Sequence, residues 1–374
     1  MISVPHRPQH QPTVVGCGFV ALDVVLHDDW AVQYAGVGGT VGNVMSIMAF
    51  LGWRSVPVVR LGADPAGAQV LQELVSLGVD TSQIVLDKRV KTPVVYQRNA
   101  GQAGHHSFSF RCPHCGQARR FSEQLLEGIG TQAAEPLAQR GDVYFFDRLT
   151  SRSVEMAEQA KVNGALTVFE PSAVGQDTDL FERALHASHI VKYSAERLAD
   201  WVMPVLGAGF VEIQTLGAAG LRFRMRSLDP SWVTLPAFRA GYVIDTAGSG
   251  DWCTAGLLHI MSGCLPGGML SDLGYNKIHS ALRAGQLMAA LNCQHTGARG
   301  LMRHVSAQPL RELLFTVLER DALSCQSSLE LDWFIRDAVG ARSPTEVATH
   351  EAQAALPLCC DAIPSLRSGP ALFH

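Results

Sequence analysis

Hydrophobic positions along the chain form short apolar runs that alternate with segments of helical periodicity. The runs predict strands at Thr13–Val15, Val56–Arg60, Val143–Phe146, Leu166–Phe169, Ile190–Lys192 and Phe210–Gln214. Helices are predicted between them, including Asn43–Leu51 and Val70–Leu77. Gly52 and Gly78 follow these helices at the position that favours a left-handed cap. This alternation predicts a doubly wound α/β fold, in which helices flank a mostly parallel sheet.

Two regions interrupt the alternation. Residues 90–111 have the pattern of a β-hairpin, with strands at Pro93–Arg98 and His106–Phe110 and a turn at Gly101–Gly104. From Ser343 onward the chain is rich in Ala, Pro and Ser and has no clear periodicity. We therefore expect one domain over residues 13–330, followed by an extension over residues 331–374 whose structure the pattern does not predict.

Composition narrows the class of protein. The 374 residues are 47% hydrophobic and 17% charged, which is typical of a folded chain with a sizeable core and excludes a disordered one. A net charge of -4 provides no general attraction for nucleic acid or acidic membranes. No apolar stretch reaches the ~20 residues of a membrane span. Nine scattered cysteines, an odd number, predict a protein of the reducing cytoplasm.

The segment Asp245-Thr-Ala-Gly-Ser-Gly-Asp251 carries the most chemical information. A loop of small residues leads into the apolar run Trp252–Met261, which predicts a buried helix. Amides at a helix start have no internal partner, so the loop can cradle an anion such as a phosphoryl group. Asp251 at the helix entrance could accept a proton from a hydroxyl group. The simpler alternative is a helix capped by this aspartate.

Two segments nearer the N-terminus share this small-residue character. Gly16-Cys17-Gly18 follows the first predicted strand, with Asp23 shortly after it. A dinucleotide site would need a third glycine, which disfavours a Rossmann oxidoreductase. Gly38-Gly39-Thr-Val-Gly-Asn43 precedes a predicted helix, and Asn43 could simply cap that helix.

Together these motifs resemble the ribokinase-like (PfkB-type) carbohydrate kinase family over roughly residues 13–310. The heptapeptide resembles the family's C-terminal signature. The resemblance implies a Rossmann-like sheet with a small β-strand lid, here at about residues 20–37 and 85–112. It implies Asp251 as catalytic base and Gly248, Ser249 and Gly250 as an anion hole. It also implies that Asp23, Gly38, Gly39 and Asn43 bind the substrate.

The same resemblance implies a cofactor site for ATP and Mg²⁺. Thr215-Leu-Gly217-Ala-Ala-Gly220 resembles the family's nucleotide loop, and Phe169-Glu170-Pro171-Ser172 resembles a strand end in which the family has Asp. The implied cofactor-binding residues are Lys192, Thr215, Gly217, Gly220, Asp245 and Thr246. Glu196 would position Mg²⁺ through water, although a solvated helix glutamate is an equal alternative. Residues 289–300 resemble the turn that closes the adenine pocket, where carbonyls can hold a monovalent cation such as K⁺.

Cys112-Pro-His-Cys115-Gly116 has the spacing of half a structural zinc site. The missing ligands could come from Cys359 and Cys360, or from His105 and His106. Two cysteines on an ordinary loop are the alternative.

We therefore expect an ATP-dependent kinase that phosphorylates a hydroxyl of a small sugar or sugar-like substrate. The resemblance implies a homodimer, and no nucleic-acid or membrane partner is expected. A nucleoside kinase of the same fold is one alternative. A catalytically silent, ligand-binding regulator on a kinase fold is another alternative. It is favoured by the position of Glu196, which lies one residue earlier than the glutamate of the family, at whose position Arg197 stands, and disfavoured by the intact Asp245–Asp251 loop.

Overall fold

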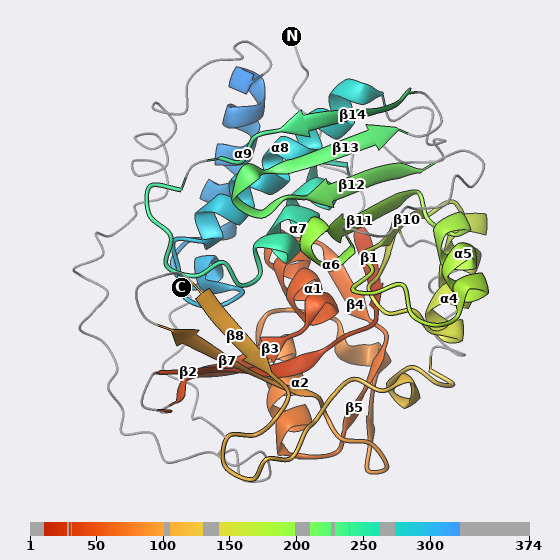
Figure 1. The fold of residues 1–374 in the computed structure, drawn as a ribbon, viewed down its shortest axis with the longest axis vertical. Helices are drawn as coiled ribbons and strands as arrows, with labels where there is room; N and C mark the ends of the chain where they lie inside the picture. The colour runs from red at the N-terminus through yellow and green to blue at the C-terminus, as the bar shows by residue number, and fades with distance from the viewer. Residues whose placement is uncertain are drawn as a thin grey trace.

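The main layer of the molecule is an eight-stranded sheet (Figure 1). The computed structural model describes residues 11–27, 30, 32–100, 105–129, 142–198, 210–225, 229–238, 240–261 and 274–321. In spatial order the strands are β14 (Asp229–Leu235), β13 (Leu221–Met225), β12 (Val211–Thr215), β11 (Ile190–Ser194), β10 (Leu166–Phe169), β9 (Val143–Phe146), β1 (Thr13–Cys17) and β4 (Arg54–Pro57). The strands from β12 to β4 are parallel, and β13 and β14 are antiparallel additions at one edge. The predicted fold class is confirmed.

Helices cover both faces of this sheet. One face carries α1 (Thr40–Phe50), α7 (Ser249–Met261), α8 (Tyr275–Asn292) and α9 (Ala307–Asp321), and the other carries α4 (Ser151–Val162) and α5 (Thr178–His186) (Figure 1). Successive residues of a strand point to opposite faces, so Val14 packs into the first core and Val15 into the second. Shorter helical segments are α6 (Ala195–Leu198), η1 (Thr81–Gln83), η2 (Glu123–Leu125), η3 (Gly217–Ala219) and η5 (Gly300–Arg303).

A second sheet of four strands lies beside the main one (Figure 1). Its spatial order is β3 (Val32–Gly38), β2 (Ala21–Leu26), β7 (Val94–Ala100) and β8 (His105–Ser109). β7 and β8 form the predicted antiparallel pair, while the predicted turn at 101–104 lies outside the described residues. Helix α2 (Pro65–Ser76) packs against β2 and β3. The extension over residues 331–374 also lies outside the described residues.

The prediction of one strand over Val56–Arg60 is wrong. The chain forms two strands there, β4 in the main sheet and β5 (Val59–Gly62), which pairs with β6 (Ile84–Asp87) in a small sheet. β4 is the edge strand of the main sheet, where proline is tolerated, and its ladder with β1 ends with the hydrogen bond of 2.7 Å from the Val58 amide to the Gly16 carbonyl, directly after Pro57. Residues 85–87, expected near the lid, therefore pair with β5 instead.

The two helices predicted from their glycine stops are confirmed. α1 and α2 end just before Gly52 and Gly78, whose φ angles of 92° and 74° are left-handed. Both helices begin earlier than predicted, and Asp64 caps α2 by accepting a hydrogen bond from the Gly67 amide. Within the described parts of the chain, no helix has both the length and the apolar character needed to cross a membrane.

Candidate active site

The candidate site lies where several parallel strands end. β1, β9 and β10 are followed by Phe19, Asp147 and Glu170, and the loop before α7 brings Asp251 to the same edge. Open α/β sheets bind ligands outside the carboxyl ends of their strands. Two of the predicted motifs, far apart in sequence, meet here.

Asp251 is the third residue of α7, and its carboxylate contacts Asn43 in α1. Asn43 Nδ2 donates a hydrogen bond of 2.7 Å to Asp251 Oδ2, across 208 residues of sequence. The alternative of Asn43 as a helix cap is wrong, because Gly39 occupies that position. Asn43 Oδ1 is buried and has no hydrogen-bond partner among the described residues. A ligand hydroxyl or N–H could provide that donor.

The loop before Asp251 has a shape that only glycine permits. Gly248 has φ 73°, and a Cβ there would lie 2.3 Å from the carbonyl oxygen of Ala298. Asp245 is buried and fixes the loop: its Oδ1 accepts from the Ala247 amide, and its Oδ2 from the Gly297 amide, each at 2.8 Å. Asp245 thus ties the loop before α7 to the turn at Gly297.

Burial and charge adjust the acidity of Asp251. Burial, together with the nearby Glu170 carboxylate, raises the pKa of Asp251 to about 8. The hydrogen bond from Asn43 and the positive charge of Lys192 act in the opposite direction. A carboxylate in this state can exchange a proton near neutral pH, as a general base must.

Glu170 and Lys192 form a buried ion pair beside the loop. Lys192 Nζ lies 2.6 Å from Glu170 Oε1, and Thr254 Oγ1 donates to Glu170 Oε2 at 2.7 Å. A Cβ on Gly250 would lie 3.7 Å from Lys192 Nζ, so this positive charge adjoins the anion loop. The motif around Glu170 was noted in the sequence, but this pairing was not foreseen.

Asp23 and the two glycines of the N-terminal motif lie together. A Cβ on Gly38 would lie 1.8 Å from the Cγ of Asp23, so the carboxylate rests against bare backbone. Gly39 has φ 77° and lies against Phe19 at the start of α1. Burial raises the pKa of Asp23 to about 7, while Arg299 lowers it. Gly39 also begins the helix that carries Asn43, which contacts Asp251.

The predicted nucleotide loop is the turn from β12 to β13. Thr215 ends β12, and Gly220 has φ 105°, with Leu235 too close for a side chain there. Gly217, with φ 58°, is exposed, and nothing lies within 4 Å of a Cβ placed on it. Its bare backbone therefore faces open space, which suits the approach of a nucleotide. Glu196 is exposed in α6, the segment after β11.

Asp147 is a site residue that the sequence reading missed. It is buried directly after β9, and its Oδ1 accepts a hydrogen bond of 2.8 Å from the Phe19 amide. Gly18 makes room for it, because a Cβ there would lie 1.9 Å from that oxygen. Its position after a parallel strand was the available signal.

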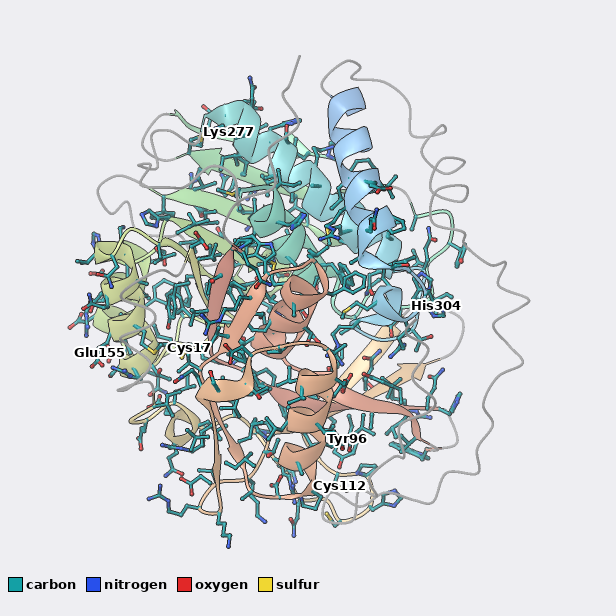
Figure 2. All side chains as sticks on the ribbon, turned by 180° about the vertical axis from the view of Figure 1, so that it is seen from behind. Cys17, Tyr96, Cys112, Glu155, Lys277 and His304 are labelled. Carbon is teal, nitrogen blue, oxygen red and sulfur yellow. The ribbon has the colours of Figure 1, made fainter. Side chains whose placement is uncertain are left out.

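The two cysteines of the predicted zinc motif lie elsewhere. Cys112 is buried and Cys115 is exposed, on a turn after β8. In Figure 2, Cys112 lies in the lower part of the view, below Cys17, which ends β1. Among the described residues no three His, Cys, Asp or Glu side chains cluster as metal ligands. Cys359 and Cys360 and the side chains of His105 and His106 lie outside what the structure describes.

Comparisons with known proteins show the family of the chain. The family model of the pfkB family carbohydrate kinases matches residues 33–304. An uncharacterized sugar kinase of Pyrococcus horikoshii is 27% identical over 275 residues, which are 70% of this chain and 82% of that protein. Fructokinase with bound ATP from Xylella fastidiosa superposes with a TM-score of 0.63 at 20% identity, covering 83% of this chain and 99% of that one. Aminoimidazole riboside kinase from Salmonella enterica gives a TM-score of 0.58 at 21% identity, covering 82% of this chain and 99% of that one. The chain therefore belongs to the pfkB family of carbohydrate kinases and is an ATP-dependent kinase of the ribokinase fold.

Proposed function

We propose that this enzyme transfers the γ-phosphoryl group of ATP to a hydroxyl of a small sugar or sugar-like substrate, with Asp251 as catalytic base. The observation that carries the proposal is the contact between Asn43 and Asp251. This contact connects the loop before Asp251, which suits an anion, to the segment around Asn43, which suits the hydroxyl groups of a polyol. A substrate hydroxyl beside Asn43 would therefore also face the Asp251 carboxylate.

The anion hole would consist of the amides of Gly248, Ser249 and Gly250. They belong to the start of α7, where the helix dipole favours negative charge. The rigid loop geometry means that little reorganisation accompanies the reaction, which is the condition for strong electrostatic stabilisation. Lys192 adds a positive charge next to Gly250.

The substrate would bind through Asp23, Gly38, Gly39 and Asn43. The Asp23 carboxylate and the unpaired Asn43 oxygen are acceptors, which suit the hydroxyl groups of a sugar. Asp251 would take the proton of the attacking hydroxyl as the oxygen bonds to phosphorus. Phosphoryl transfer depends mainly on such positioning and on charge stabilisation.

ATP would bind along Thr215, Gly217 and Gly220, with its phosphates toward Lys192, Asp245 and Thr246. Mg²⁺ supplies charge neutralisation on the phosphates when bound, and one exposed carboxylate such as Glu196 suits an ion that keeps most of its waters. Carbonyls near Asp245 and residues 289–300 would hold a monovalent cation such as K⁺. A homodimer completes the proposal, with β3 and β8 as the edge strands of the four-stranded sheet.

An activity screen tests the proposal. Purified protein is incubated with MgATP and a panel of sugars, sugar acids, sugar phosphates and nucleosides, and ADP formation is followed. We expect substrate-dependent ADP release with at least one sugar-like compound and transfer of one phosphoryl group to it, seen by mass spectrometry. A preference for nucleosides over every sugar would establish the alternative of a nucleoside kinase.

A further inference from the structure

Arg148 lies at the edge of the candidate site, and no sequence motif singled it out. It follows Asp147 at the end of β9, beside the residues that follow β1 and β10. Its Nη1 donates to Asp147 Oδ2 at 2.7 Å, to the Asp147 carbonyl at 3.0 Å and to Ser172 Oγ at 3.3 Å. Arg148 therefore spans the ends of two neighbouring strands.

Aromatic rings hold the guanidinium group in place. Its Cζ lies 4.5 Å from the ring centroid of Phe19 and 5.5 Å from that of Phe121. The two rings also contact each other edge to face, at 6.1 Å between centroids. A cation packed in this way is stabilised by the ring faces and loses little further freedom when it binds a ligand.

One side of the guanidinium group remains available. All three of its hydrogen bonds use Nη1, and among the described residues Nε and Nη2 have no hydrogen-bond acceptor. The side chain is 18% exposed, so part of it is accessible from outside the protein. Nε and Nη2 present parallel N–H groups, the fork that matches the two oxygens of a carboxylate or phosphate.

The Nε and Nη2 donors of Arg148 lie near the start of α1, where the proposed substrate-binding residue Gly39 is found. Phe19, which packs on the guanidinium group, accepts the amide of Val41 through its carbonyl and lies against Gly39. On the other side, Ser172 follows Glu170 by two residues. A ligand group on Arg148 would thus lie beside the proposed polyol site.

We propose that Arg148 binds an acidic group of the substrate, a carboxylate or a phosphate, so that the enzyme phosphorylates an acidic sugar. The proposal rests on the proposed function and deepens it. Asp147 pairs with Arg148 as Glu170 pairs with Lys192, but the Nε and Nη2 donors of Arg148 still have no acceptor among the described residues. Arg148 therefore decides both that an acidic group is accepted and where it lies.

Calorimetric titration without ATP tests the proposal independently of catalysis. The probes are D-gluconate, D-fructose 6-phosphate and their neutral counterparts D-glucose and D-fructose. We expect at least one acidic probe to bind more tightly than its neutral counterpart, and Arg148→Gln to weaken that binding by roughly 10- to 150-fold, the value of a charge-assisted hydrogen bond. Gluconate and the sugar phosphate distinguish the two possible acidic groups.

Two further variants distinguish a specific loss of binding from a general loss of structure. Arg148→Lys keeps the charge but not the fork, and we expect binding intermediate between wild type and Arg148→Gln, with an unchanged thermal melt. Arg183→Gln removes an exposed arginine that pairs with Glu158 on the far face, and it should bind like wild type. Any of three results would overturn the proposal: equal binding of acidic and neutral probes, no binding of either acidic probe, or no effect of Arg148→Gln on binding.

The outcome is separable from that of the proposed function. Binding of an acidic sugar through Arg148 without any phosphoryl transfer would refute the kinase reaction and leave this proposal intact. Phosphorylation of neutral sugars that is unaffected by Arg148→Gln would support the kinase reaction and refute the role of Arg148 in binding an acidic group.

Discussion

Gly248 shows how one residue fixes the geometry of the loop over residues 245–250, which we propose as the anion-binding loop. Gly248→Ala places a Cβ 2.3 Å from the Ala298 carbonyl oxygen at φ 73°, so the loop must move. Gly78→Ala is a matched control, because φ there is 74° and nothing lies within 4 Å. Both substitutions incur about 1–2 kcal/mol of left-handed strain. We expect only Gly248→Ala to lower kcat, by at least 10²-fold, as measured by steady-state kinetics; equal loss in both variants would contradict this role.

The pH dependence of the reaction tests the assignment of the base. Burial, and then Glu170, raise the pKa of Asp251 to about 8, and the base must be ionised, so kcat/KM should rise with pH and level off above about 8. Glu170→Gln removes a negative charge and frees Lys192, and both changes favour ionisation. We therefore expect the midpoint to move to lower pH. The control Glu158→Gln, at an exposed ion pair, should leave the profile unchanged. A midpoint that stays or rises in Glu170→Gln would contradict the assignment.

Sequence reasoning identified some of these residues and missed others for a physical reason. Asp251 and Asn43 each lie in a local motif, and their contact could be expected from the family resemblance. Asp147 and Arg148 lie in no motif. Their neighbours come from distant segments, as with Asp147 and Phe19, 128 residues apart, and such contacts exist only in the folded chain.

At the scale of elements, strands inside the main sheet were predictable because their apolar runs are buried on both faces. β9 and β10 match their predicted bounds of Val143–Phe146 and Leu166–Phe169. The division of Val56–Arg60 was not predictable from hydrophobicity, since both halves are buried. Only Pro57 marks the point where the chain changes sheets.

A buried hydrogen bond connects the four-stranded sheet to the loop before α7. Gln97 in β7 donates from Nε2 to Asp245 Oδ2 at 2.8 Å. We predict that this sheet is a lid that becomes more ordered when substrate binds, because closure would exclude water from the phosphoryl group. Hydrogen exchange in residues 94–109 should slow with substrate and a nonhydrolysable nucleotide. In Gln97→Ala, exchange of the unliganded enzyme should be faster. Exchange unaffected by ligands would contradict a lid.

At the scale of the whole molecule, the zinc motif belongs to the segment directly after β8, in which Phe110 packs against Phe19 with 6.1 Å between ring centroids. We predict that Cys112 and Cys115 bind zinc for structure, with ligands from Cys359 and Cys360 or from His105 and His106. The tight turn at Gly116, with φ 71°, suits two thiolates on one ion. Elemental analysis of protein purified without chelator should give one zinc per chain, and Cys115→Ser should lower both zinc content and thermal stability. Zinc well below one equivalent, with both thiols reactive in the folded protein, would contradict the prediction.

The folded chain also brings segments that are distant in sequence together around Arg299. Arg299, after α8, donates to Ser46 in α1, Tyr34 in β3 and Glu73 in α2. This buried network holds the four-stranded sheet against both helices. The network therefore connects the four-stranded sheet to α1, the helix that carries Asn43.

The central claim is that Asp251 is the base of an ATP-dependent phosphoryl transfer, and a comparison of wild type with Asp251→Asn tests it most directly. The substitution keeps the shape of the side chain and its contact with Asn43. Folding of the wild type takes up a proton at Asp251 between about pH 4 and 8, so the wild type loses stability across that range, and the variant should be at least as stable at pH 8. We predict intact ATP binding by calorimetry and a turnover reduced by roughly 10²- to 10⁴-fold. Turnover within about threefold of wild type would contradict the claim.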